Sequence, residues 1–419
     1  MSAPLFSALG SLAPPWRHLP MRGGLPPGVS LARAQVASRS TVLGTDGQTY
    51  AEVLADLPRF SGAARRLLLE GQRSNALRNP RGEGGTPGTS TLPTHWGSVI
   101  FGGLTRTFVE ARSEIGLQGA RLRLQGTATG SSSTTALGGS LEIAAASQQV
   151  WTFSAFIRLV SGTPLSAAMR LFCRDAGGAV VSSPSTQTLS LTGDLVRFER
   201  TFTLPTTATI AFVQPSIQFG IASGETYDIG FDVLGAQMEL GAFASTPILP
   251  APGAPAASTR GADLASIPLA SLGLGGACTL LWSGLLPQLA QDADQMLLQL
   301  DDGTDSSRFT LRNPAAGSGL VAGRVLAGAA ADSPSLGTIT AGTPFRAVLA
   351  IEGGRIAASL EGGAVQVATG GPTTGLTTLR IGNNAANTAA LFGRVGSLAF
   401  LPFAAPDAAL PGLCTTLPL

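Results

Sequence analysis

Apolar and polar residues alternate along many short stretches of this chain, the pattern expected of strands that bury one face. From Trp151 to Leu159, every second residue is apolar and most of the intervening ones are polar. The same alternation covers residues 196–204 and 227–240, with a break at Gly235. Turns rich in glycine separate these stretches. Several short antiparallel strands of this kind predict a β-sandwich.

The last part of the chain repeats this signature. Residues 296–300 and 308–312 predict two strands joined by an acidic hairpin loop. Residues 345–351 alternate in the same way before a glycine turn. We therefore expect a second all-β body, since one ordinary hydrophobic core rarely serves 419 residues.

The predicted fold class is mainly β, with two tandem antiparallel β-sandwich (jelly-roll) domains behind an extended N-terminal anchoring segment. We divide the chain into an N-terminal connector (residues 1–72), a first sandwich (73–250), a linker rich in proline and alanine (251–258) and a second sandwich (259–419).

Prolines shape the expectation for the N-terminal connector. Pro14-Pro15-Trp16 and Pro26-Pro27 preclude a long helix there, whereas residues 51–57 could form a short helical turn. Such a segment buries little surface by itself. We expect it to become ordered against another subunit or another protein.

Composition narrows the possible partners. Charged residues make up 12% of the chain and the net charge is +2, so no strong field favours nucleic acid or an anionic membrane. No apolar span is long enough to suggest membrane insertion, and the N-terminus lacks the marks of a secretory signal. All 27 basic residues are arginine, which a genome rich in G and C or a selection for guanidinium groups would explain. The cysteines have no metal-binding spacing, and Cys173 and Cys278 are expected to be buried free thiols.

The chain lacks the residues that most kinds of catalysis require. The only histidines are His18 and His95, too few for histidine-based metal catalysis and poorly suited to a Ser-His-Asp triad. Without lysine there is no P-loop. Paired carboxylates remain possible, as glycosidases require. The local candidates could equally be polar turn residues or a calcium-supporting loop; they are Asp292 with Asp294, and Asp301, Asp302 and Asp305.

A resemblance to known proteins is carried by the connector. It contains Arg39-Ser40-Thr41, then Pro58-Arg59-Phe60, then a Leu-Leu-Glu-Gly-Gln-Arg-Ser-Asn segment ending at Asn75. This order resembles a connector found in virion proteins of tailed bacteriophages and gene transfer agents, where it precedes carbohydrate-binding sandwiches. Ser74 and Ala76 stand where the usual pattern has Thr and Leu.

Both predicted sandwiches carry shorter resemblances. Asn79-Pro80-Arg81 through His95-Trp96, with a closing strand at residues 235–241, is similar to a jelly-roll carbohydrate-binding module. The segment Thr259 to Asp263, with strands at 379–383 and 392–398, resembles a concanavalin-like lectin domain.

The module resemblance also implies sites. It places a possible structural calcium at Glu83 and Asp232, and no other cofactor is expected. Sugars stack on aromatic rings that are flanked by polar side chains. His95 and Trp96 in the entry segment, and Tyr227 beside Glu225, are the candidate carbohydrate-binding residues, whereas Trp151 and Trp282 are typical of strand cores.

Together these resemblances imply a non-catalytic virion protein, a head spike or tail fibre, that attaches a particle to host capsular or surface polysaccharide. The connector would bind other virion proteins, and the protein would be assembled in the bacterial cytoplasm and displayed on the particle surface. A homo-oligomer is expected, first a trimer and second a pentamer. A particle-borne polysaccharide depolymerase and a purely architectural decoration protein are the alternatives.

Overall fold

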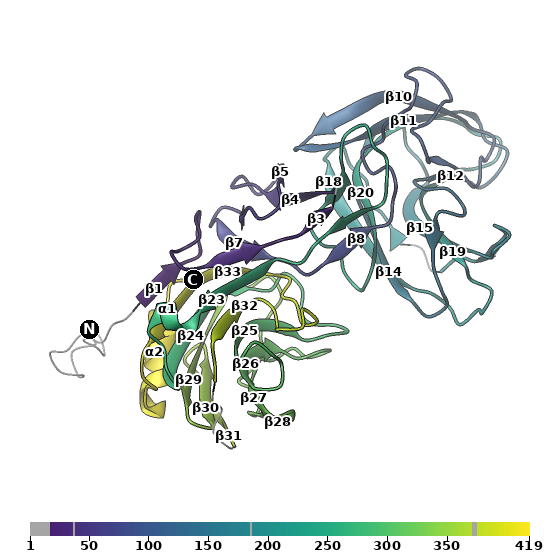
Figure 1. Cartoon of the computed structure of the whole chain (residues 1–419). Coiled ribbons are helices and arrows are strands. Elements are labelled where there is room, and N and C mark those ends of the chain that lie inside the picture. Colours follow the sequence, from purple (N-terminus) through teal and green to yellow (C-terminus); the bar gives the residue numbers. More distant parts are fainter. Residues whose placement is uncertain (1–16, 37, 185–186, 371–374) are drawn as a thin grey trace.

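Residues 17–36, 38–184, 187–370 and 375–419 are described by a computed structural model, so Pro14-Pro15-Trp16 lies outside the described residues. Nearly all regular structure is strand. Figure 1 shows two β bodies, with the purple connector running along the second toward the first. The prediction of a mainly β chain with two sandwiches is confirmed.

The first sandwich packs two antiparallel sheets around one core formed by residues between Leu77 and Met238. Trp151 and Phe153 lie in this core, as their alternation with polar neighbours predicts. One sheet has the order β10 (Thr105–Glu114), β11 (Leu117–Thr127), β20 (Thr226–Leu240), β14 (Val150–Ser161), β18 (Val196–Thr203). The other has the order β16 (Val180–Ser182), β15 (Ser166–Arg174), β19 (Phe212–Gly220), β12 (Ser132–Ala136), β9 (Gly97–Ser98), with β13 (Ile143–Ala144) and β17 (Gln187–Thr188) beside it.

The second sandwich has larger sheets because the connector adds strands to both. The eight-stranded sheet has the order β31 (Gln366–Thr369), β30 (Arg355–Leu360), β29 (Phe345–Glu352), β24 (Ala277–Leu285), β33 (Gly393–Leu401), β7 (Arg66–Leu69), β6 (Arg59–Ser61), with β1 (Arg17–Pro20) also on β33. The seven-stranded sheet has the order β2 (Ser30–Ala32), β23 (Leu264–Pro268), β32 (Thr378–Ile381), β25 (Gln295–Asp301), β26 (Arg308–Asn313), β27 (Val321–Leu326), β28 (Ala329–Asp332). Helix α2 (Leu410–Thr416), preceded by a 3-10 turn (Asp407–Ala409), covers the outer face of the larger sheet, and the short α1 (Leu269–Leu272) follows β23.

The described part of the connector is ordered against its own chain. Met21, Leu67 and Leu69 are fully buried in the core of the second sandwich. The expectation that this segment buries little surface without another subunit is therefore wrong for residues 17–72. Strands β1 and β7 both pair with β33, so their backbone N–H and C=O groups are hydrogen-bonded within the sheet.

The expected helical turn at residues 51–57 is also wrong. Tyr50–Val53 forms strand β5, which pairs with β4 (Ser38–Leu43). The Tyr50 ring packs edge-on against Phe156 of the first sandwich, with ring centroids 5.6 Å apart. This tertiary contact and the pairing with β4 override a weak local preference.

Two three-stranded sheets join the bodies. β21 (Ile248–Pro250) pairs with β4, and β22 (Ser258–Arg260) lies between β3 (Gln35–Val36) and β8 (Arg73–Asn75). The chain on both sides of the predicted linker is thus hydrogen-bonded to the connector.

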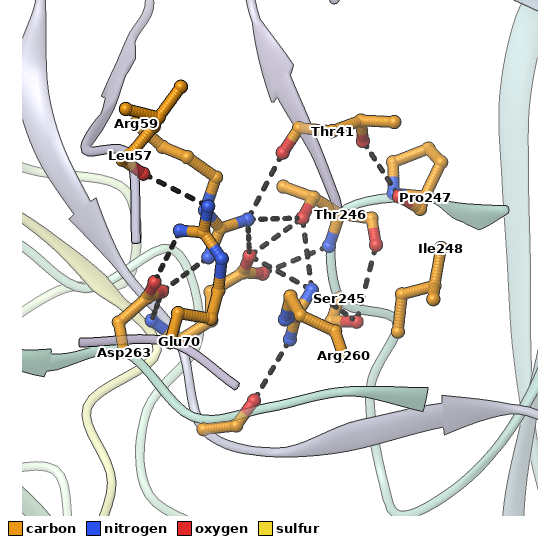
Figure 2. A network of polar contacts seen from close by, with 12 residues as sticks. Thr41, Leu57, Arg59, Glu70, Ser245, Thr246, Pro247, Ile248, Arg260 and Asp263 are labelled. Carbon is orange, nitrogen blue, oxygen red and sulfur yellow. Dashed lines mark hydrogen bonds and ion pairs between the residues drawn. The ribbon is translucent and has the colours of Figure 1, made fainter. Parts of the chain in front are cut away.

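A buried ionic network lies at the same junction, and we call it the junction network (Figure 2). Its charged members are Arg33, Arg59, Glu70, Arg260 and Asp263. Asp263 accepts from Arg33 Nη1 at 2.7 Å and also pairs with Arg59. Glu70 accepts from Arg59 at 2.6 Å and lies 3.1 Å from Arg260 Nη1.

The network connects three parts of the chain. Thr246, at the end of the first sandwich, donates its hydroxyl to Glu70 at 2.6 Å. Arg33, Arg59 and Glu70 come from the connector, and Arg260 and Asp263 open the second sandwich. Buried charges are tolerated only when paired in this way. Arg59 and Glu70, which stand in the connector pattern, thus contact residues of both sandwiches.

Three further features concern isolated residues and elements. Cys173, Cys278 and Cys414 are buried free thiols, as predicted for the first two. Burial raises the pKa of the Cys173 thiol to about 11. Among the residues that the structure describes, no helix has the length and apolar character needed to cross a membrane.

Candidate functional site

A cleft of about 550 Å³ lies between the two sandwiches. Each sandwich and the end of the connector contribute to its lining. The first sandwich supplies Gln149, Val150, Leu240 and Gly241, followed by Phe243; the connector end supplies Gly71, Gln72 and Arg73; the second sandwich supplies residues 290–295 and Asn387, Thr388, Ala390 and Phe392.

Two aromatic rings packed against an arginine form the apolar part of the cleft. The Arg73 guanidinium lies 4.7 Å from the ring centroid of Phe243 and 5.0 Å from that of Phe392. The two rings meet edge to face at 4.9 Å. Arg73 also donates to the Leu240 carbonyl oxygen. These contacts fix a guanidinium and two half-buried rings in the cleft.

The backbone approaches these rings closely. A Cβ atom at Gly71 would lie 2.7 Å from Ala390 Cβ and 2.9 Å from the Phe392 ring, so only glycine fits there. The Phe392 N–H donates to Gln295 Oε1 at 2.9 Å. The close approach of Gly71 to the ring and the hydrogen bond from the backbone N–H to Gln295 therefore fix the position of Phe392.

Amide side chains supply most of the polar lining, and Gln72, Gln291 and Asn387 are exposed. Gln149 is oriented because its carbonyl accepts from Trp151 Nε1 at 3.0 Å and from the Ala146 N–H at 2.9 Å. Amides both donate and accept, which matches the hydroxyl groups of a sugar. The cleft combines partly exposed rings with such groups.

Carboxylates are found on one side of the cleft only. Asp292 and Asp294 both come from the 290–295 loop. Asp294 is held by Arg312 at 2.8 Å and by the Ala315 N–H at 2.9 Å. The lining residues from the first sandwich and the connector include no acid. Glycoside hydrolysis requires two carboxyl groups that flank the bond, an arrangement that these lining residues do not provide.

The four predicted carbohydrate-binding residues lie elsewhere, and none of them lines the cleft. Trp96 is buried in the core of the first sandwich, with its indole N–H donating to the Asn79 carbonyl at 3.0 Å, so its ring is not available for stacking. His95 Nδ1 lies 2.5 Å from Glu142. Tyr227 is half-buried and its hydroxyl accepts from the Ala222 N–H, while Glu225 is exposed in the adjacent turn.

The two acids expected near calcium in the first sandwich have other partners. Asp232 is fully buried and pairs with Arg121 at 2.7 Å and Arg158 at 2.8 Å. Burial alone would raise the pKa of Asp232, but hydrogen bonds from these arginines hold it below its usual range. Glu83 instead accepts from the Gly253 N–H. The guanidinium groups of Arg121 and Arg158 balance the charge of Asp232.

The acidic loop of the second sandwich follows β25, as predicted, and it has internal partners. Asp301 is buried and pairs with Arg380 at 2.7 Å, while Asp302 accepts from the Thr304 N–H and hydroxyl. In the described part of the chain, no group of three or more His, Cys, Asp or Glu side chains is arranged to hold a metal ion.

Asp305 has a positioning role. Its carboxylate accepts from Asn384 Nδ2 at 2.8 Å and from two backbone N–H groups of the same loop. Burial alone would raise the pKa of Asp305, but a hydrogen bond from Gln299 and the Arg308 charge keep it low. Asp305 thereby fixes the loop that carries Asn387 and Thr388 into the cleft.

Comparisons with known proteins concern the architecture alone. No family model and no curated protein sequence matches this chain. A carbohydrate-binding module of the Ruminococcus gnavus sialidase bound to α2,3-sialyllactose is 18% identical, covers 35% of this chain and 86% of its own, and has a TM-score of 0.28. The tripod of the bacteriophage Tuc2009 baseplate is 11% identical over 77% of this chain and 98% of its own, at a TM-score of 0.30. A tandem carbohydrate-binding module from Paenibacillus barcinonensis Xyn10C is 11% identical over 78% and 96%, at 0.26.

Proposed function

We propose that this protein is a non-catalytic glycan-binding protein of a particle surface, and that the cleft between its sandwiches binds a host capsular or surface polysaccharide. The cleft is the observation that carries this proposal. It presents two aromatic rings, a fixed guanidinium and several amides along one surface, the combination with which proteins bind sugars.

The placement on a virion, as a head spike or tail fibre, is supported by the connector resemblance at residues 39–75. Residues 1–16 and the exposed connector surface would then contact other virion proteins. Each cleft would bind weakly, so attachment would depend on several copies acting together in a trimer or, as second choice, a pentamer. Size-exclusion chromatography with light scattering measures this state directly.

The binding site is tested on an array of bacterial capsular and surface polysaccharides probed with the purified full chain. The double variant Gln72→Ala/Gln291→Ala removes two exposed amides from the cleft. We expect about tenfold weaker binding to the glycan that the wild type prefers, because each lost hydrogen bond contributes about 0.5–1.5 kcal/mol.

Gln48→Ala is the matched control, since Gln48 is exposed in a turn outside the cleft. It should bind as the wild type does. An array without any bound glycan, or equal losses in the cleft variant and the control, would contradict the proposal. New reducing ends released from the bound polysaccharide would show a depolymerase instead.

A further inference from the structure

A second, smaller pocket of about 150 Å³ adjoins the cleft, and Phe243 and Phe392 line both. Tyr50, Arg197, Gln288 and Arg394 also line it. Its volume is well below the roughly 300 Å³ of a pocket for a whole small molecule. It therefore suits one substituent of a ligand whose main body lies in the cleft.

Two guanidinium groups in this pocket lack a carboxylate partner. Among the described residues, neither Arg197 nor Arg394 forms an ion pair, and the buried Nε atom of each has no hydrogen-bond partner. Arg197 Nη2 is anchored by Ser154 Oγ at 3.0 Å and by the Ser245 carbonyl at 2.8 Å. The two guanidinium groups therefore line the pocket without a carboxylate of their own, and an anionic ligand would supply one.

The titratable groups that line the pocket are Tyr50, Glu70, Arg197 and Arg394. Glu70 is the only acid, and its charge is already matched by Arg59 and Arg260 of the junction network. Burial raises the pKa of Tyr50, so its phenol stays neutral and can donate.

Further positive charge lies behind Arg394. Burial lowers the pKa of Arg66, and the charges of Arg22 and Arg394 lower it further. The pocket and its surroundings thus hold more guanidinium groups than carboxylates, because Glu70, which raises the pKa of Arg394 against the lowering by burial, also pairs with Arg59 and Arg260. A protein tolerates such an excess where a ligand completes it.

We propose that this pocket binds the carboxylate of an acidic sugar, held by Arg197 and Arg394, while the sugar ring lies in the adjoining cleft. This inference rests on the proposed function and specifies its ligand as an acidic glycan. The guanidinium fork binds a pair of carboxylate oxygens in bidentate geometry, and because it binds phosphate in the same way, sulfate and phosphate are the competitors in the test.

The test is a titration of the full chain with sodium glucuronate. Binding is monitored by NMR from the chemical shifts of the Arg197 and Arg394 Nε–H groups. The methyl ester of glucuronic acid is the neutral match, and inorganic sulfate and phosphate are the competing anions. We expect glucuronate to shift both signals and to bind at least about tenfold more tightly than its ester.

Arg394→Gln should reduce the preference for the free acid over the ester toward unity. Arg123→Gln should keep the full preference, because Arg123 is exposed and pairs with Asp228 in the first sandwich, outside the pocket. A wild type that binds ester and acid equally, or sulfate or phosphate more tightly than glucuronate, or a chain whose Arg197 and Arg394 signals do not move, would overturn the proposal.

The two proposals can fail separately. If glucuronate shifts the arginine signals but no polysaccharide on the array depends on the cleft amides, the anion pocket stands and the proposed function falls. If the array shows binding that depends on the cleft but prefers neutral glycans, the proposed function stands and the acidic ligand is wrong.

Discussion

Glu70 is an acid whose ionisation is tied to the fold. Burial alone would raise its pKa, but Arg260 and Arg59 hold the pKa at about 2 instead of its ordinary 4.5. Because the folded-state pKa is the lower one, the resulting stabilisation is complete above about pH 4.5 and is lost as the pH falls toward 2. The difference corresponds to about 3 kcal/mol of unfolding free energy.

Glu70→Gln should therefore lower the stability at pH 7 by about 3–5 kcal/mol, since it leaves the buried Arg260 without a carboxylate partner and removes one of the two that Arg59 has. Between pH 5 and pH 2 the variant should lose about 3 kcal/mol less than the wild type. Urea denaturation across this pH range measures both effects. Glu361→Gln, at an exposed position, is the control; if it behaves like Glu70→Gln, the network has no special part in acid stability.

At the scale of elements, strand β7 of the connector stabilises a sandwich whose remaining strands, apart from those of the connector, lie between Leu264 and Leu401. Leu69 is fully buried against the second core. Leu69→Ala should destabilise the protein by about 2–5 kcal/mol in chemical denaturation, with the cost borne by the second sandwich. Leu54→Ala, in the same connector at an exposed position, should change stability by less than about 0.5 kcal/mol. An equal effect of both would mean that β7 is not part of that core.

The sequence allows the strands to be predicted but not all of their partners. Alternation around Trp151 reports burial on one face, a local property that the structure confirms. Tertiary packing is not local, which is why Tyr50–Val53 was not predicted as a strand: the ring that Tyr50 packs against, Phe156, lies in the first sandwich. Asp232 has the same difficulty, because its partner Arg121 lies 111 positions away. Trp96 lies in an irregular segment without an alternating pattern of apolar and polar residues, so its burial could not be predicted from the sequence.

The cleft is a feature of the whole molecule, because both sandwiches and the connector line it. Its lining comes from five segments between Gly71 and Phe392, and no motif marks them as a set. Arg73 stands within the connector pattern, but its two aromatic neighbours, Phe243 and Phe392, lie far from it in sequence. A site formed between bodies can be found only once their relative placement is known. The junction network and the two small joining sheets connect the sandwiches, and we expect the network to set their relative placement.

Asp263→Asn tests this dependence, because Asp263 joins Arg33 and Arg59 of the connector to the start of the second sandwich. In small-angle X-ray scattering we expect a larger radius of gyration for this variant, and weaker binding of any glycan that requires the cleft. The wild-type profile should not change in about 1 M salt, because salt screens exposed charges far more than buried ones. Asp407→Asn removes an exposed pair with Arg355 and should leave the profile unchanged. An unchanged profile for Asp263→Asn would show that the small joining sheets alone hold the two sandwiches in place.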